Sequence, residues 1–138
     1  MLNIISLDHI VLRTTKLAKM LHFYCDILGC VIERKLPEHV GLIQLRAGSA
    51  LIDIVPVDSE LGRVGGKAPS QDGRNLEHFC LIIEDLGEDQ LDRYLTANKL
   101  DHEIMVERYG ATGFSKSVYI QDPEGNVVEL KLDNNHLG

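Results

Sequence analysis

Two short stretches of this chain repeat one pattern of residue types, an acid followed by a histidine at the start of an apolar strand. They read LDHIVL around His9 and LEHFCL around His78. Two later stretches, ALIDIV and NVVELKL, each carry a carboxylate between aliphatic residues, Asp53 in the first and Glu129 in the second. A carboxylate inside an apolar strand is costly unless something compensates its charge. Two imidazoles and two carboxylates are ligands typical of a first-row divalent metal, so these four residues predict a metal site.

Two copies of one β-α-β-β-β unit are predicted to position these ligands. The first copy has an expected strand at about 6–13, a helix over KLAKMLHFYCDILG, and strands VIERK, GLIQLRA and ALIDIVPV. The second has an expected strand at about 76–83, a helix over LGEDQLDRYLTANK, and strands HEIMVE, FSKSVYIQ and NVVELKL. Side chains alternate faces along a strand, and each helix should cover the more apolar face of its sheet. His9 and His78 are therefore expected on the uncovered, concave faces.

The helix predictions depend on apolar spacing and on end signals. In the first helix the apolar residues recur at steps of three and four: Leu17, Met20, Leu21, Tyr24 and Leu28. Gly29 can end that helix in the left-handed conformation. In the second copy Asp85 is the expected N-cap, and Glu88 and Asp89 suit the positive end of the helix dipole.

The bulk composition limits the classes of protein to consider. A chain of 138 residues fits a single domain, divided here into a first module at about 4–57, a linker loop at 58–75 and a second module at about 76–133. The net charge of −7 argues against nucleic acid or an anionic membrane as partner. Without a basic segment before the first apolar residues, a secretory signal is not expected, and the three cysteines should be reduced in a cytoplasmic protein. The histidines expected to lie outside the metal site are His22, His39, His102 and His136.

Four segments spread over residues 7–132 resemble the vicinal oxygen chelate superfamily, which includes glyoxalase I, fosfomycin-resistance enzymes and extradiol dioxygenases. They are LDHIVLRT, FYCDILG, LEHFCLII and YIQDPEGNVVEL. The resemblance implies an α+β fold in which two paired β-α-β-β-β modules form a curved sheet cup around a divalent metal (Ni, Zn, Mn or Fe). It assigns the ligand positions to His9, Asp53, His78 and Glu129, and it implies a homodimer in which a metal site can draw on both subunits.

A lactoylglutathione-lyase-type reaction on a small substrate with adjacent oxygens is the first activity that the resemblance implies. Glu129 is then the candidate proton acceptor, with Asp53 second. Arg13 matches the arginine that holds the glutathione carboxylate in glyoxalase I, so a glutathione adduct is a candidate substrate. Two departures weaken this match, since Val57 stands where that enzyme has an asparagine and Asp53 is one methylene shorter than the usual glutamate.

Three alternatives remain open on the sequence alone. Ser117 and Tyr119 match pocket residues of the fosfomycin-resistance thiol transferases, although Val11 replaces a threonine that contacts substrate there. Without Asp53 as a ligand, His9, His78 and Glu129 would form the two-histidine, one-carboxylate site of Fe(II) ring-cleaving dioxygenases. A non-catalytic protein that sequesters its ligand is the third alternative. The retention of a metal-binding side chain at all four positions favours an enzyme.

Overall fold

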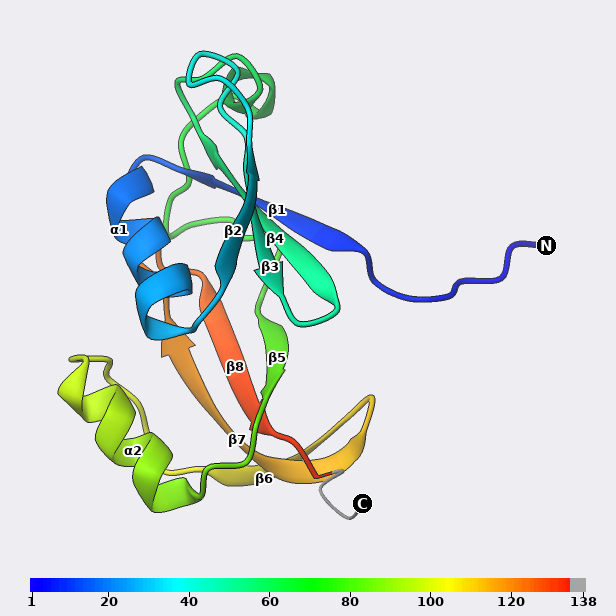
Figure 1. Ribbon diagram of the computed structural model, residues 1–138, viewed down its shortest axis with the longest axis vertical. Coiled ribbons are helices and arrows are strands. Elements are labelled where there is room, and N and C mark those ends of the chain that lie inside the picture. Colours follow the sequence, from blue (N-terminus) through cyan, green and yellow to red (C-terminus); the bar gives the residue numbers. More distant parts are fainter. Residues whose placement is uncertain (135–138) are drawn as a thin grey trace. The chain divides into compact units, whose positions relative to one another are not determined.

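The computed structural model describes residues 1–134 and divides into two compact units, one spanning Met1–Gln71 and the other beginning at Asp72. His136 lies outside the described residues. Each unit combines a four-stranded mixed sheet with one helical segment that follows its first strand (Figure 1). This confirms the α+β fold class with repeated β-α-β-β-β connectivity. Among the described helices, none has the length and apolar character needed to cross a membrane.

The first unit forms a sheet with the strand order β1-β4-β3-β2. In chain order its elements are β1 (His9–Thr14), α1 (Leu17–Leu21), the π-helix η1 (His22–Ile27), β2 (Val31–Lys35), β3 (Ile43–Ala47), β4 (Ala50–Pro56) and the 3-10 helix η2 (Gly62–Gly65). Strand β1 runs parallel to β4, whereas β4–β3 and β3–β2 are antiparallel. The parallel pair requires a crossover, which α1 and η1 supply together with β2 and β3.

The second unit repeats this topology with the order β5-β8-β7-β6. Its elements are β5 (Phe79–Ile83), α2 (Glu88–Ala97), β6 (Val106–Gly110), β7 (Gly113–Gln121) and β8 (Val127–Leu132). The DPEGN turn before β8 is held by Asp122, whose Oδ1 accepts hydrogen bonds from the backbone N–H of Glu124 and of Asn126, both 2.9 Å long. This turn aligns β8 against β7 and so determines where Glu129 lies.

One face of each sheet is apolar and buried, and the other carries the polar side chains. In the first unit Leu12, Leu45, Ile52 and Ile54 are buried on the helix-covered face. In the second unit the corresponding buried residues are Val118, Ile120, Val128 and Leu130. Since strand side chains alternate, Asp53 and Glu129 must lie on the opposite face of their sheets, as the sequence pattern predicts.

The prediction of one continuous α-helix in the first unit is wrong. It is α-helical only over Leu17–Leu21 and then widens into a π-helix, in which the N–H of Leu28 bonds to the carbonyl of Phe23 at 3.0 Å. Each π turn accommodates an extra residue, which shifts the buried stripe around the helix. Phe23, absent from the predicted stripe, is therefore buried beside Tyr24.

Two boundaries in the second unit also differ from the prediction. Helix α2 begins at Glu88 after Gly87, and Asp85 does not cap it: its Oδ1 instead accepts a hydrogen bond from Gly87 N–H at 3.0 Å. The strand expected at 102–107 begins only at Val106. Its first residues are held toward α2 instead, because His102 bonds to Asp92 on that helix and to the carbonyl of Leu100.

Candidate metal centre

In the second unit, a histidine and a glutamate from the two parallel strands lie in direct contact. His78 immediately precedes β5, and the β5–β8 register places Cys80 opposite Glu129. Nε2 of His78 lies 3.2 Å from Oε1 of Glu129, whose side chain is largely buried. The other ring nitrogen, Nδ1, hydrogen-bonds to the Glu77 carboxylate. A carboxylate on the second nitrogen is the usual way in which proteins orient a metal-binding imidazole.

Two residues of β7 complete the surroundings of this pair. Ser117 is fully buried and its hydroxyl donates a 2.7 Å hydrogen bond to Oε2 of Glu129. Tyr119, opposite Glu129 in the β7–β8 register, packs edge-on against His78 with ring centroids 5.2 Å apart. Burial, followed by the Glu129 charge, raises the pKa of Tyr119 above its usual value, so the phenol stays protonated at neutral pH. Ser117 thus hydrogen-bonds to the carboxylate of Glu129, while Tyr119 packs against the imidazole of His78.

In the first unit a histidine and a carboxylate share one face of the two equivalent strands. The parallel β1–β4 register sets Val11 opposite Asp53, and His9 lies on the same face of β1. Asp53 is only 3 % exposed, and Gln44 donates to its Oδ2 at 3.3 Å. Its other oxygen, Oδ1, is buried without a hydrogen-bond partner among the described residues. The hydrogen bond that His9 makes to the Asp8 carboxylate raises the pKa of His9; burial opposes this rise, and the Asp53 charge adds to it.

These residues fit a divalent cation by their chemistry. A buried carboxylate oxygen with no partner is a group that native proteins rarely leave unsatisfied, and a bound cation would satisfy it. The described residues contain no group of three or more His, Cys, Asp or Glu placed to hold a metal, so the four predicted ligands are not brought together. Each unit supplies one imidazole and one carboxylate.

Arg13, predicted to bind substrate, instead binds the loop that follows β4. Its Nε donates to the Gly62 carbonyl at 2.9 Å, Nη2 to Gly66 at 2.6 Å and Nη1 to Lys67 at 2.8 Å. Gly65 packs so closely on the guanidinium that an added Cβ would lie 2.4 Å from Nε. A substrate carboxylate would have to compete with these carbonyls for the guanidinium. A role for Arg13 in substrate binding therefore stays a prediction.

Arg13→Ala is expected to loosen this loop without unfolding the sheet. The three lost hydrogen bonds are charge-assisted but partly exposed, so amide exchange at Arg63 and Gly66 should accelerate by about tenfold. Hydrogen–deuterium exchange with site resolution measures this directly. Arg46→Ala is the matched control and should leave the loop unchanged, since among residues 1–134 Arg46 pairs with the exposed Glu33 alone. Equal exchange in both variants would contradict the tethering role.

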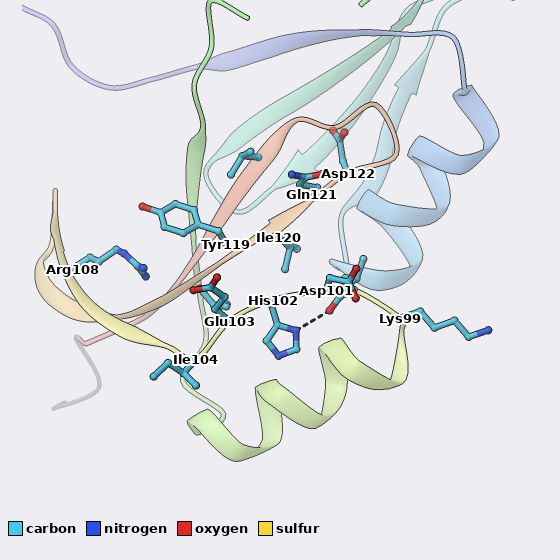
Figure 2. Close-up of a pocket in the computed structure, with 13 residues that line it drawn as sticks. Lys99, Asp101, His102, Glu103, Ile104, Arg108, Tyr119, Ile120, Gln121 and Asp122 are labelled. Atoms are coloured by element: carbon cyan, nitrogen blue, oxygen red, sulfur yellow. Dashed lines mark hydrogen bonds between the residues drawn. The ribbon is translucent and has the colours of Figure 1, made fainter. Parts of the chain in front are cut away.

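A cavity of about 840 Å³ lies in the second unit, at the edge of β7 that β6 leaves uncovered (Figure 2). The segment 99–104 forms one wall and residues 118–122 form the other, and Arg108 also lines it. His102 holds the wall in place through Leu100 O at 2.8 Å and Asp92 Oδ1 at 2.7 Å. These two acceptors, the carbonyl first, raise the pKa of His102. The cavity is within the usual volume range for small-molecule sites.

Sequence reasoning missed Arg108, Gln44 and Glu77 as parts of the site. Arg108 lies in β6, and the strand predicted there ended one residue before it. Gln44 was an ordinary polar residue in a strand until the β3–β4 register placed it opposite Asp53. The usable signal was the alternation of side chains along β3 and β6, which puts Gln44 and Arg108 on the polar face of their sheets.

Comparison with known proteins places the chain in one family. The family model described as Glyoxalase/Bleomycin resistance protein/Dioxygenase superfamily matches residues 6–130. A biphenyl-2,3-diol 1,2-dioxygenase of Rhodococcus globerulus is 30% identical over 135 residues, which cover 91% of this chain but only 62% of that protein. A structure from the mobile metagenome of V. pseudocholerae superposes with a TM-score of 0.76 at 26% identity, covering 98% of this chain and 99% of the other.

A lactoylglutathione lyase from Agrobacterium tumefaciens has the same fold. Its TM-score is 0.64 at 24% identity, with 96% of this chain and 97% of the other covered. The chain spans less than two thirds of the length of the Rhodococcus dioxygenase. It matches the V. pseudocholerae and Agrobacterium structures almost end to end. The chain therefore belongs to the Glyoxalase/Bleomycin resistance protein/Dioxygenase superfamily, as the resemblance in its sequence predicts.

Proposed function

We propose that this protein is a metal-dependent enzyme acting on a small substrate that presents two adjacent oxygens. Its ligands for a divalent Ni, Zn, Mn or Fe ion are His9, Asp53, His78 and Glu129. The observation that carries the proposal is the contact of His78 with the largely buried Glu129; the buried Oδ1 of Asp53, which has no partner among the described residues, supports it. The two modules then work as one functional domain in a cytoplasmic homodimer.

The chain's own residues have separate tasks in this proposal. When bound, the metal supplies Lewis acidity that stabilises negative charge developing on a substrate oxygen. Glu77 and Asp8 hold the imidazoles of His78 and His9 by hydrogen bonds to Nδ1. Ser117 donates to Oε2 of Glu129 and Gln44 donates to Oδ2 of Asp53, so one oxygen of each carboxylate is occupied. Glu129, with Asp53 second, is the proposed acceptor of a substrate proton.

Two reactions compete within this proposal. The first is a lactoylglutathione-lyase-type isomerisation, with Arg13 released from its loop to hold a glutathione carboxylate. The second is Fe(II)-dependent cleavage of an aromatic diol by a site made of His9, His78 and Glu129. The similarity to the Rhodococcus dioxygenase and the engagement of Arg13 by loop carbonyls both favour the second reaction.

Metal analysis followed by two turnover assays tests the proposal. The purified chain, reconstituted separately with Ni, Zn, Mn and Fe(II), is expected to retain about one ion per chain for at least one of them. Turnover of methylglyoxal with glutathione would support the lyase, and oxygen consumption with 2,3-dihydroxybiphenyl or catechol would support the dioxygenase. Failure to retain any of the four ions would contradict the metal site and indicate a ligand-sequestering protein.

A further inference from the structure

The arginine in the first strand of each β-β-β meander is connected to the carboxylate in the last strand by hydrogen bonds through one neutral side chain. In the second unit, Nη1 of Arg108 donates to Ser117 Oγ at 3.0 Å, and Ser117 Oγ donates to Glu129 Oε2 at 2.7 Å. In the first unit, Nη1 of Arg34 donates to Gln44 Oε1 at 3.2 Å, and Gln44 Nε2 donates to Asp53 Oδ2 at 3.3 Å.

The two chains of hydrogen bonds occupy equivalent strands. Arg34 and Arg108 lie in β2 and β6, the neutral residues in β3 and β7, and the carboxylates in β4 and β8. Both sheets have the same order, so each chain crosses its sheet from the edge strand to the ligand strand. The side chains that carry the hydrogen bonds differ, an amide in one unit and a hydroxyl in the other. The same connection is thus built twice from different residues.

Each arginine determines the direction of its hydrogen-bond chain. A guanidinium can only donate, so Ser117 Oγ must accept from Arg108, and its single proton is then directed to Glu129. Likewise only one orientation of the Gln44 amide lets its oxygen accept from Arg34 while its nitrogen donates to Asp53. One oxygen of each carboxylate is thereby occupied.

The remaining oxygen of each carboxylate is left for another partner. Oε1 of Glu129 lies 3.2 Å from His78 Nε2, and Oδ1 of Asp53 is buried without a partner among the described residues. Arg108 is itself fixed, since its Nη1 also donates to Ser117 O at 2.8 Å and its guanidinium carbon lies 4.5 Å from the Tyr119 ring centroid. A fixed donor can hold a carboxylate in one rotamer.

We infer that Arg34 and Arg108 are positioning residues that present one oxygen of Asp53 and one oxygen of Glu129 to the bound metal. The inference rests on the proposed function, in which both carboxylates are ligands. It adds that the carboxylates bind through a single oxygen each, Oδ1 and Oε1, and that the arginines act on the metal only through Gln44 and Ser117. Groups that orient metal ligands typically contribute about 10–100-fold to metal affinity.

Competition with a chromophoric chelator tests the inference, using Co(II) as the probe ion and the full chain. Arg108→Ala and Ser117→Ala are each expected to weaken Co(II) binding by about tenfold or more. The double variant should bind no more weakly than Ser117→Ala alone, because both substitutions break the same connection. Arg108→Lys, which keeps the charge but loses the planar fork, should restore only part of the affinity. Additive losses in the double variant would overturn the inference.

The visible spectrum of bound Co(II) supplies a readout that loss of stability would not change. Arg34→Ala and Arg108→Ala should alter the d–d bands, whereas Arg46→Ala, on the same sheet as Arg34, should leave them as in the unsubstituted protein. If the unsubstituted chain binds no Co(II), the proposed metal site fails, and the inference fails with it. If it binds Co(II) and both Arg34→Ala and Arg108→Ala match it in affinity and spectrum, only the positioning role is overturned.

Discussion

His78→Ala is expected to abolish stoichiometric metal binding while leaving the protein folded. The imidazole contributes one of four proposed ligands, and its Nε2 already faces the Glu129 carboxylate at 3.2 Å. Losing a ligand should weaken binding by more than the roughly 100-fold upper range seen for groups that merely orient ligands. The side chain is 32% exposed, so the free energy of unfolding of the metal-free protein should change by less than about 1 kcal/mol. Metal content after dialysis and chemical denaturation measure the two effects.

His22→Ala is the matched control for this substitution. His22 is exposed and pairs with Asp26 one turn along the helix, away from the sheet residues that hold the proposed ligands. It should retain the metal content of the unsubstituted chain. One tightly bound ion per chain in the His78 variant would remove His78 from the ligand set and leave the repeated histidine pattern without its proposed purpose.

The duplicated ligand pattern could be predicted because its causes are local in the sequence. Alternation along a strand places His9 with Val11 and separates Asp53 from Ile52 and Ile54, whatever the neighbouring strands do. The same reasoning applies to Glu129 in β8. The internal repeat predicted the β-α-β-β-β connectivity, the family resemblance implied the same one, and the observed sheets agree with it.

The residues around the carboxylates could not be predicted because they depend on register between strands. Whether Gln44 or a neighbour lies opposite Asp53 is decided by the β3–β4 pairing, which nothing within β3 specifies. A bulge in β2 between Ile32 and Arg34 shifts the pairing again before Arg34 reaches Gln44. The β3–β4 register is set at the turn that joins Ala47 to Ala50, and a shift of one residue there would change every pair along the two strands.

The loop contacts of Arg13 illustrate the same limit. Strand alternation puts Arg13 on the face that carries His9, and the resemblance to glyoxalase I suggested that it contacts substrate. Its actual partners are three backbone carbonyls about fifty residues later in the chain. Backbone acceptors leave no mark in the side-chain sequence, apart from the glycines that permit the close approach, among them Gly65.

Asp53→Asn is expected to stabilise the metal-free protein and to weaken metal binding at the same time. The carboxylate is 3 % exposed, one oxygen receives a single long hydrogen bond from Gln44, and the other has no partner among the described residues. Asparagine has nearly the same shape without the charge. Removing a poorly compensated buried charge should raise the free energy of unfolding without metal by about 1–2 kcal/mol.

The metal-bound protein should respond in the opposite sense, because a neutral amide is a weaker ligand than a carboxylate. The gain in thermal stability on adding the ion should therefore shrink in Asp53→Asn, since that gain follows the affinity of the folded state. Glu33→Gln, on the exposed surface of the same sheet, should change neither quantity. A destabilised metal-free variant would mean that the charge of Asp53 is already compensated without the ion. Unchanged metal affinity would instead exclude Asp53 as a ligand and leave His9, His78 and Glu129, the set that suits Fe(II) and ring cleavage.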